Sequence, residues 1–266
     1  MSSVDCSRSA GFYAWRRRPA SPRQLQDRRL LTEMEAILDQ SRGTYGSPRL
    51  HRVLMSRGHR VSRRRIERLM GVGGRRARIV RVYRPRAGTH RWFGQHANHV
   101  QRTHATRRDQ IWVSDLTYLA VGGRWWFLAA VLDQYSRRVL AWRLGATRDS
   151  RLTRAVVDAA LRRSRPAAGL IFHSDRGSEF LGILFRARLT AAGVQQSMTR
   201  GGAPGENVHM ESFFHSLKAD VIHGHVFQTP DELRRHLRRY IRYYNHQRLH
   251  SSLGYQSPVD YERTAA

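Results

Sequence analysis

The sequence predicts an α/β fold in which a mixed five-stranded sheet with flanking helices follows a small all-α segment. Two observations predict it. From residue 111 onward, short runs rich in aromatic and β-branched residues alternate with helical patterns in the order βββαβαβα. Before residue 71, apolar residues recur only at helical spacing. With 266 residues and 40 % hydrophobic content, the chain can bury one core of ordinary size and a smaller one.

The N-terminal part predicts three helices. An amphipathic helix over residues 21–42 is ended by Gly43. Two shorter helices over 48–57 and 62–70 are joined by a short turn, and the pair resembles a helix-turn-helix. The second of them carries four arginines that suit a DNA groove or its phosphates: Arg63, Arg64, Arg65 and Arg68. A solvated basic face is the alternative interpretation, because arginine is common throughout this chain.

The core begins with three strands, which we expect over residues 111–120, 124–133 and 138–144. Gly122 and Gly123 lie between the first two strands and form a hairpin turn that requires positive φ. Each strand is then separated from the next by only a few residues. The three strands are therefore expected to form an antiparallel meander.

Helices and two more strands follow the meander. Ser150 is expected to cap a helix, and Ser178 another. A fourth strand is expected over 170–173 and a fifth over 194–198, and a glycine-rich loop then leads into a last helix over 207–223. This order of elements describes the ribonuclease H-like architecture.

Three carboxylates stand out in that architecture. Asp115 interrupts the first apolar strand, Asp175 follows the fourth, and Glu211 lies in the second turn of the last helix, with 35 residues between it and Asp175. Three carboxylates in one dry cleft repel each other, so such a cluster is tolerated mainly when divalent cations neutralise it. Paired cations are what phosphodiester chemistry needs, one for the attacking oxygen and one for the leaving oxygen. The sequence therefore predicts these residues as catalytic metal ligands for cutting and joining DNA.

The charge of the chain indicates its partner. A formal net charge of +28 and an isoelectric point near 11.7 favour binding to a polyanion, and nucleic acid is the expected one. No apolar run is long enough to span a membrane and no signal peptide opens the sequence, so we expect no membrane partner and a cytoplasmic, nucleoid-associated location.

The single cysteine excludes an internal disulfide and a cysteine-pair zinc site.

Further DNA contacts are expected around the carboxylates and in the tail. Lys218 is the only lysine, so 48 − 1 = 47 of the basic residues are arginines. It follows Glu211 by seven residues and shares its helix face, which suits contact with the DNA backbone beside the metals. Arg234 and Arg238 face outward from a helix after residue 229, and Arg248 lies in the closing segment. Chance survival of one lysine and a solvated arginine face are the alternatives.

Several longer motifs make the sequence similar to a known family. These are YGSPRLHRVL, WVSDLTYL around Asp115, HSDRGSEF around Asp175, ENVHMESFFHSLKAD around Glu211, and the closing YNHQRLHSSLGYQSP. Over roughly residues 10 to 262 they resemble the catalytic, second-reading-frame protein of the IS-three family of bacterial insertion sequences, whose members are DDE transposases with a retroviral-integrase-like catalytic core.

The resemblance implies a metal-dependent polynucleotidyl transferase that cuts at the ends of its own element and joins a freed 3′-hydroxyl to a target strand, in DNA transposition, integration and recombination. It implies Asp115, Asp175 and Glu211 as ligands of two Mg²⁺ (or Mn²⁺) ions per active site. It also implies a homo-oligomer that bridges two DNA ends, and an upstream helix-turn-helix and coiled-coil partner or fusion. No leucine heptads occur here, so the chain resembles the downstream half alone, and Met1 need not be the start of the active fusion.

Four segments follow from these patterns. Residues 1–70 are expected to form a helix-turn-helix-like DNA-binding segment, and 71–108 a basic linker. Residues 109–225 are expected to form the integrase-like catalytic core through the glutamate-bearing helix. Residues 226–266 add a basic helix and a tail that complete the core.

Two departures from the family pattern concern the site. Gly201-Gly202 and Glu206-Asn207 stand where the family commonly has a basic residue with glycine and an Asp-Asn pair. Glu179 stands where an uncharged polar residue is more usual, and we expect it to complement a helix N-terminus rather than bind metal. His173 faces the same side of its strand as Asp175; a packed histidine is expected there, with orientation of a ligand or water as the alternative.

Three rival functions stay open from the sequence. A ribonuclease H-like nuclease or junction resolvase would share the fold and metals but stop at hydrolysis. A DNA-binding regulator with a decayed core would lack metal-dependent activity. A recombinase would use a protein nucleophile such as Tyr118 or Ser114, although neither has the expected arginine and histidine residues around it. Tryptophans of the strands could stack on unpaired bases, but we expect them to fill the core: Trp112, Trp125, Trp126 and Trp142.

Overall fold

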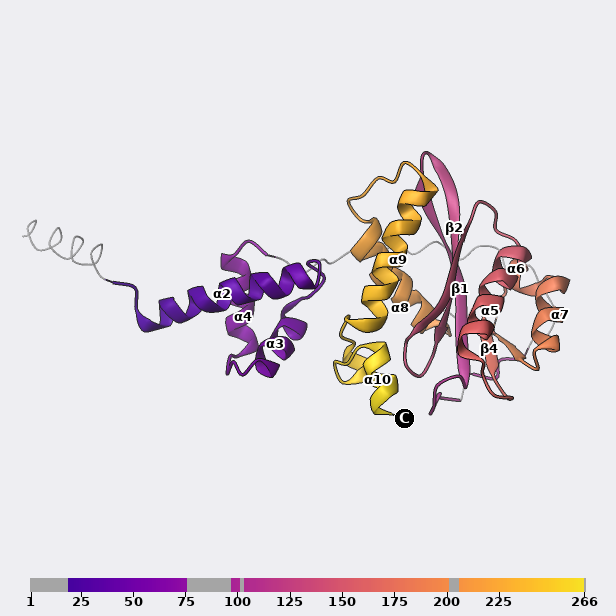
Figure 1. Cartoon of the computed structure of the whole chain (residues 1–266), viewed down its shortest axis with the longest axis horizontal. Coiled ribbons are helices and arrows are strands. Elements are labelled where there is room, and N and C mark those ends of the chain that lie inside the picture. The colour runs from indigo at the N-terminus through magenta and orange to yellow at the C-terminus, as the bar shows by residue number, and fades with distance from the viewer. Residues whose placement is uncertain (1–18, 76–96, 101–102, 201–205, 266) are drawn as a thin grey trace, which may run out of the picture. The chain divides into compact units, whose positions relative to one another are not determined.

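The computed structural model describes residues 19–75, 97–100, 103–200 and 206–265. The chain divides into two compact units, residues 1–77 and 78–266, each with its own core (Figure 1). Cys6, part of the expected linker and the glycines of the loop 201–205 lie outside the described residues. Within the described part, no helix is long and apolar enough to cross a membrane.

The first unit contains three helices: α2 (Pro22–Gln40), α3 (Ser47–Ser56) and α4 (Arg63–Val72). Ser21 caps α2 in a reciprocal capping box with Gln24, and Ser62 caps α4 by accepting a hydrogen bond from the backbone N–H of Arg65. Their apolar faces form one small core, made of Leu30, Met34, Ile37, Leu38, Leu50, Leu54, Ile66, Leu69 and Met70. The predicted helix-turn-helix-like arrangement of helices is confirmed.

The second unit is built on a five-stranded sheet with the order β3-β2-β1-β4-β5. Its strands are β1 (Ile111–Val121), β2 (Arg124–Asp133), β3 (Val139–Gly145), β4 (Ile171–Ser174) and β5 (Gln195–Met198). The first three form the predicted antiparallel meander, whereas β4 pairs in parallel with both β1 and β5. Gly122 and Gly123 have φ of 54° and 72°, as the predicted hairpin turn requires.

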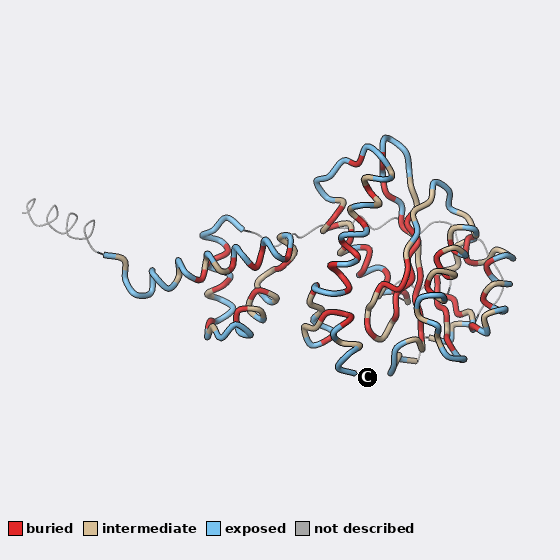
Figure 2. The backbone as a smooth tube through the Cα atoms, viewed as in Figure 1, coloured by how far each residue is buried: buried red, intermediate tan, exposed pale blue. Residues whose placement is uncertain are grey.

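Helices cover both faces of this sheet, and apolar residues alternate between two cores. One core lies beneath α5 (Ser150–Ser164), α6 (Ser178–Leu181) and α7 (Ile183–Ala191). The other lies beneath α8 (Val208–Leu217), which continues as the π-helix η1 (Lys218–Ile222), and α9 (Pro230–His246). A 3₁₀ turn, η2 (Ser251–Leu253), and α10 (Pro258–Thr264) close the chain. Figure 2 shows buried backbone concentrated in the strands between these two helical layers.

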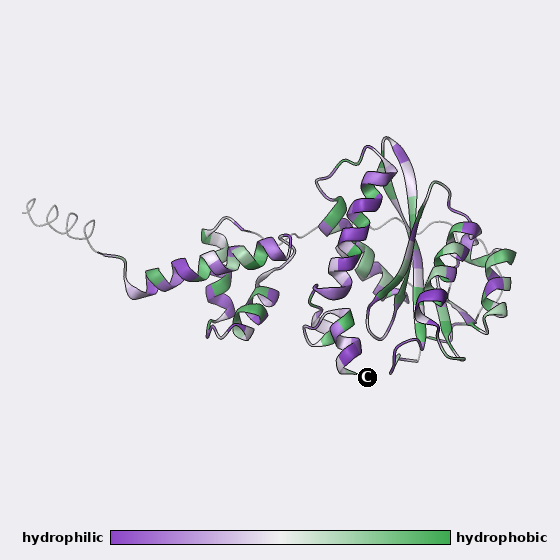
Figure 3. Cartoon of the chain, in the orientation of Figure 1, coloured by the Kyte–Doolittle hydropathy of each residue, from purple (hydrophilic) through white to green (hydrophobic). Residues whose placement is uncertain are grey.

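Helix α9 has the strongest separation of apolar and polar faces. Thr229 caps it and Pro230 opens it, as predicted. Its buried side includes Leu233, Leu237 and Tyr240, which belong to the sheet's core. Figure 3 shows the alternation of hydrophobic and hydrophilic ribbon along this helix. The tail is therefore part of the second unit's core rather than an appendage.

Three local predictions were wrong. Asp149, not Ser150, caps α5, because its carboxylate accepts hydrogen bonds from two backbone N–H groups of the first turn. The helix expected to begin with Ser178 as cap is instead two helices, with Gly177 before the first and a break at Gly182. A Cβ at Gly182 would lie 2.6 Å from Cβ of Ser150, so the break permits close packing on α5.

A fourth prediction, that Trp125 fills the core, was also wrong, because its side chain is exposed. It is 60 % exposed near the hairpin end of β2, where its ring packs edge-on against Tyr118 with centroids 5.1 Å apart. Trp112 is fully buried as expected, while Trp126 and Trp142 are partly buried against the core beneath α8 and α9.

Candidate active site

Asp115 and Asp175 are brought together by the parallel pairing of β1 and β4. Val113 pairs with His173 at the last step of that ladder, and each aspartate lies two residues further along its own chain direction. Because parallel strands advance together, the two carboxylates meet at the end of β4, where β1 continues toward the hairpin. The structure therefore places these two predicted residues side by side.

The electrostatics of the pair reflects burial and mutual repulsion. Burial and the charge of Asp175 raise the pKa of Asp115 to about 8. Burial also raises the pKa of Asp175, with Glu179 adding to the effect. Each carboxylate accepts one backbone hydrogen bond, Asp115 from Leu116 at 2.7 Å and Asp175 from Gly177 at 3.0 Å, and these bonds only partly offset the burial. Oxygen ligands in this repulsive arrangement fit a hard divalent cation.

Glu211 is carried into the neighbourhood by the start of α8. The helix begins at Val208, so Glu211 lies in its first turn rather than the second. Asn207, the residue before the helix, donates its side-chain amide to the carbonyl oxygen of Ser114 at 3.1 Å. Glu211 itself is exposed, and among the described residues no three acidic, histidine or cysteine side chains are grouped closely enough to hold a metal. The structure thus joins the aspartate pair but not the complete triad.

Lys218 lies close to the aspartate pair from the end of the same helix. Its half-buried ammonium lies 4.9 Å from the ring centroid of Tyr118. Burial lowers the pKa of Lys218, and the nearby charge of Asp115 opposes that change. The ammonium of Lys218 therefore lies within electrostatic reach of Asp115.

Glu179 and Arg148 form an ion pair at the other side of the aspartates. Glu179 is 2 % exposed, and its Oε1 accepts a hydrogen bond from Nε of Arg148 at 3.0 Å and lies 2.9 Å from Nη2 in the same ion pair. The charge of Arg148 lowers the pKa of both Asp115 and Asp175, which places the guanidinium within electrostatic reach of both. Glu179 lies in the first turn of α6, where it was expected to complement the helix N-terminus, and it has this arginine as a further partner.

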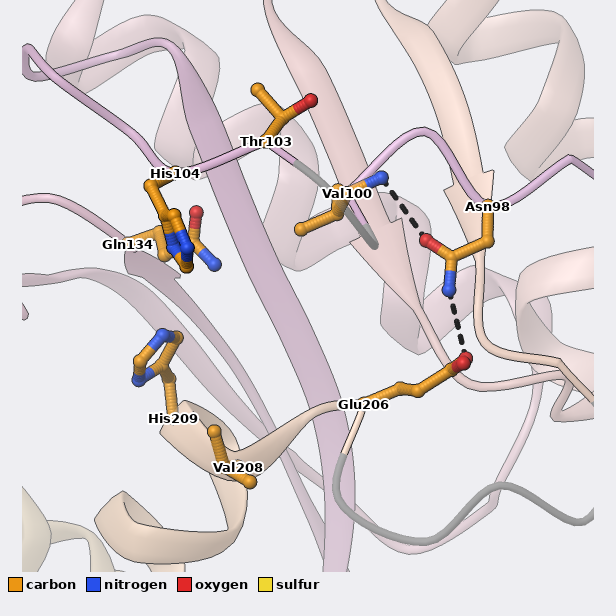
Figure 4. Close-up of a pocket in the computed structure, with 8 residues that line it drawn as sticks. All are labelled: Asn98, Val100, Thr103, His104, Gln134, Glu206, Val208 and His209. Carbon is orange, nitrogen blue, oxygen red and sulfur yellow. Dashed lines mark hydrogen bonds between the residues drawn. The ribbon is translucent and has the colours of Figure 1, made fainter.

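Glu206 fixes the chain immediately before α8. Its carboxylate accepts hydrogen bonds from the backbone N–H of Arg200 at 2.6 Å, from the Arg200 guanidinium at 2.9 Å and from the amide of Asn98 at 2.8 Å. Figure 4 shows this last bond beside a pocket of ≈ 230 Å³, in which the ring of His209 points toward His104. Residues 97–100, within the expected linker, therefore pack on the core.

His173 is a packed histidine, as expected. It is fully buried, and its Nδ1 lies 2.9 Å from the hydroxyl of Ser197, which also accepts a hydrogen bond from the backbone N–H of His99. Burial lowers the pKa of His173, so the ring is neutral. It links β4 to β5 and to the segment before the core.

Comparison with known proteins identifies this arrangement. Family models described as "Integrase core domain" match residues 105–204 and 192–258, and one described as "HTH-like domain" matches 25–83. An uncharacterized 31 kDa protein of insertion element IS600 from Shigella sonnei is 36 % identical over 94 % of this chain and 93 % of its own length. Transposase InsF for insertion sequence IS3A from Escherichia coli K12 is 30 % identical over 95 % of this chain and 89 % of its own. The chain belongs to the IS-three (IS3) family of transposases.

The fold of this transposase agrees with that assignment. A chain of the simian T-cell lymphotropic virus intasome, in complex with PP2A regulatory subunit B56 gamma, superposes with a TM-score of 0.50. That match is 14 % identical and covers 63 % of this chain and 59 % of the other. Membership of the family makes the protein a polynucleotidyl transferase that binds DNA and acts in DNA transposition and integration.

In the transposase's first unit, three of the four predicted DNA-binding arginines of α4 have acidic partners. Arg65 and Arg68 both pair with Asp27, at 2.6 and 2.5 Å, while Arg63 pairs with Glu67 at 2.8 Å. These pairs are partly or largely solvent-exposed, so each contributes little to stability and can be exchanged for a phosphate. Arg64 is exposed on the same helix.

The predicted tail arginines of the transposase differ in exposure. Arg238 is exposed on α9, and Arg234 lies over the ring of Trp126 at 5.6 Å while pairing with Asp231. Arg248 is only 7 % exposed, and its guanidinium bonds Asp220 at 3.4 Å and Ser216 at 3.1 Å. The structure therefore gives Arg248 an internal packing role and leaves the α9 arginines at the surface.

Sequence reasoning did not single out three residues that shape the transposase's site. Arg148 is one arginine among 47, so composition gave no reason to select it. Glu206 and Asn207 were noted only as departures from the family pattern, although an acidic residue and an amide directly before a catalytic helix were a usable signal. Their partners come from segments far away in the sequence, which no local pattern reveals.

Proposed function

We propose that this transposase cuts DNA at the ends of its insertion sequence and transfers the freed 3′-hydroxyl to a target strand, with Asp115, Asp175 and Glu211 as the metal ligands. The adjacency of Asp115 and Asp175 carries the proposal, because two buried carboxylates that repel each other are stabilised by bound cations. When bound, two Mg²⁺ or Mn²⁺ ions supply activation of the attacking oxygen and stabilisation of the leaving oxygen.

The chain's own residues orient the DNA around that centre. Asp115 is held within β1 and Asp175 directly follows β4, so both are positioned by the sheet. Glu211 is carried by α8, whose first residues are hydrogen-bonded to β1 through Asn207. Lys218 contributes a positive charge beside Asp115 for the DNA backbone. The exposed arginines of α4 and α9 extend the basic surface for DNA, and several subunits bridge two DNA ends.

The organisation of the chain fits this role. Residues 1–70 serve as a DNA-binding segment, 71–108 as a connection, 109–225 as the catalytic core and 226–266 as its completion. An upstream helix-turn-helix and coiled-coil protein, separate or fused, assists recognition of the element ends. The protein works at the nucleoid, where its substrate lies.

A protein nucleophile is a poorer explanation. The hydroxyl of Ser114 is fully buried and donates to the carbonyl oxygen of Ala130 at 2.8 Å, so it has no access to DNA. Tyr118 is half-exposed but lies against Lys218 and Trp125. Direct attack by water and then by a 3′-hydroxyl needs neither residue.

The test is nicking and joining of supercoiled plasmid with Mn²⁺ or Mg²⁺, comparing the wild type with Glu211→Gln. Glu35→Gln, which removes the same charge from an exposed position in the first unit, is the matched control. We expect activity in the wild type and control and none in Glu211→Gln. Equal activity in Glu211→Gln would contradict the proposal.

Strand joining separates a transposase from a nuclease that shares the fold. An oligonucleotide with a recessed 3′-hydroxyl end is incubated with plasmid, and covalent joining is scored on a denaturing gel. Joined products support strand transfer, whereas nicking alone would favour the nuclease or resolvase. Tight, salt-sensitive DNA binding without nicking, even with the upstream partner added, would favour the regulator with a decayed core.

A further inference from the structure

The buried glutamate beside the aspartate pair has an arginine as its partner. Glu179 is 1 % exposed in its side chain, and a carboxylate so placed needs a positive partner to remain charged. Arg148 supplies it, donating from Nε to Oε1 at 3.0 Å and placing Nη2 2.9 Å from the same oxygen. The pair therefore joins α6 to the segment between β3 and α5.

The backbone on both sides of this pair is fixed. Thr147 and the N-cap residue Asp149 are hydrogen-bonded to each other at 3.0 Å, directly beside Arg148. Thr153 of α5 donates its hydroxyl to the carbonyl oxygen of Glu179 at 2.7 Å. A Cβ on Gly177 would lie 2.5 Å from Glu179 Oε1, so the glycine leaves room for the carboxylate to fold back. These contacts hold the Arg148 guanidinium in a defined position.

The two partners differ greatly in exposure. Half of the Arg148 side chain is open to solvent, while the glutamate that anchors it is closed off. An arginine has five N–H donors in a planar fork, and the hydrogen bond to Glu179 engages the one on Nε. The remaining donors are available to a ligand that reaches the exposed side of the guanidinium.

The position of this fork relative to the aspartates indicates the ligand. Gly177, against which the Glu179 carboxylate folds, donates its backbone N–H to Asp175 at 3.0 Å, so the Arg148–Glu179 pair lies beside that aspartate. The charge of Arg148 acts on both Asp115 and Asp175. DNA approaching the aspartate pair brings a phosphate on either side of the bond to be cut. A planar fork of N–H donors binds phosphate oxygens in a bidentate manner.

We propose that Arg148, anchored by the buried Glu179, binds a DNA phosphate adjacent to the scissile one, and that Glu179 acts only through Arg148. This rests on the proposed function, since it assumes that DNA enters at the aspartate pair. Glu179 is then a positioning residue, and the usual uncharged residue at that position would leave the arginine without its anchor. The competing role for Glu179 is that of an additional metal ligand.

The first experiment measures DNA binding without chemistry. Full-length wild type, Arg148→Gln and Arg148→Lys bind a labelled duplex in Ca²⁺, and the dissociation constant is followed from low to high salt. Loss of one phosphate contact lowers the slope of log affinity against log salt by about 0.9. We expect that change in Arg148→Gln and little change in Arg148→Lys, which keeps the charge. Arg151→Gln, an exposed arginine on the adjoining helix, is the matched control and should lose less.

The second experiment is a double-mutant cycle on the rate of plasmid nicking, with Arg148→Gln, Glu179→Gln and both together. If Glu179 acts through Arg148, each single change slows nicking about 10- to 100-fold and the double variant is no slower than the worse single variant. If Glu179 binds metal, the losses multiply, and Glu179→Gln alone needs more Mn²⁺ for half-maximal rate. That second pattern would overturn the proposal.

The two experiments separate this proposal from the proposed function. Binding in Ca²⁺ requires no catalysis, so an unchanged salt slope in Arg148→Gln overturns the phosphate contact even if the wild type nicks no plasmid. The converse outcome is that the wild type nicks plasmid while the Arg148 and Glu179 variants nick at the same rate and show the same salt dependence of binding. That result overturns the role of Arg148 and leaves the three-carboxylate chemistry unaffected. Circular dichroism melting of each variant checks that the second unit is folded.

Discussion

Asn207 donates its side-chain amide to the carbonyl oxygen of Ser114 at 3.1 Å. The residue that precedes the glutamate-bearing helix is therefore hydrogen-bonded to the residue that precedes Asp115. Asn207 is 7 % exposed, so this bond is shielded from water, and the backbone N–H of Glu211 bonds back to the carbonyl of Asn207 at 3.1 Å. The chain thus fixes the start of α8 against β1 through one side chain.

Replacing Asn207 by alanine should reduce activity more than stability. Loss of one buried hydrogen bond costs about 0.5–1.5 kcal/mol, which a core of this size tolerates. The start of α8 then loses its bond to β1, and plasmid nicking should fall at least about tenfold because misplacement of a metal ligand is costly. Asn207→Asp should be no better, since a carboxylate would face the Ser114 carbonyl. Ser212→Ala, on the exposed side of α8, is the control; equal loss there would contradict the argument.

Asp115→Asn should be inactive yet more stable than the wild type in EDTA at pH 8. Burial and Asp175 raise the pKa of Asp115 to about 8, above its unfolded value of 3.8. Because the raised pKa makes Asp115 bind its proton more tightly in the folded state than in the unfolded state, the free energy of unfolding falls as the pH rises from about 4 to about 8. Removing the charge should raise the free energy of unfolding at pH 8 by several kcal/mol, because each pH unit between the two pKa values is worth about 1.4 kcal/mol. Melting curves from pH 5 to 8 test this, and parallel curves for the two proteins would contradict it.

His209→Gln should make the second unit more resistant to acid. Burial, with the charges of Arg137 and His104, lowers the pKa of His209 to about 4. A histidine with a lowered pKa is held neutral in the folded state, so stability is lost as the pH falls below 6.5 toward 4. Glutamine cannot take up that proton. We expect the two proteins to have the same melting temperature at pH 7.5 and the variant to have the higher one at pH 5. Equal melting temperatures at pH 5 would contradict this prediction.

Asp27→Asn should strengthen DNA binding by the full chain. Asp27 holds Arg65 and Arg68 in ion pairs, and its pKa is lowered chiefly by the bond from Arg68 and then that from Arg65. Without that charge the two guanidinium groups are released for phosphates. Affinity for a random duplex should rise several-fold at low salt, whereas Arg64→Gln should weaken it. Glu35→Asn, an exposed acid on the same helix, is the control for net charge alone.

Much of the fold could be predicted from local signals. The helix starts near residues 21, 62 and 229, which have caps at Ser21, Ser62 and Thr229, and the paired glycines of the hairpin each depend on a few neighbouring residues, and each occurs where the sequence indicated. The break at Gly182 was not predicted, because its cause is the approach of Ser150 from another helix. Local patterns do not contain that contact.

Some features of the candidate site could likewise be predicted from local patterns, and others could not. The positions of Asp115 and Asp175 follow from strand pattern and register, so their meeting at the end of β4 could be predicted. The environment of Arg248 could not, because its burial depends on Asp220 and Ser216 in another element. In a chain with 47 arginines, the residue type alone does not distinguish a buried arginine from one on the surface.

The parallel pairing of β1 with β4 also determines when the protein can become active as it folds. The two aspartates are 175 − 115 = 60 residues apart and meet only after a long segment has closed between them. Closing such a segment is slow compared with forming a helix or hairpin, so partly folded chains have their helices and meander before they have an aspartate pair. With the proposed role of the aspartates, catalysis requires a complete sheet, and nicking activity should report the finished fold more strictly than secondary-structure content does.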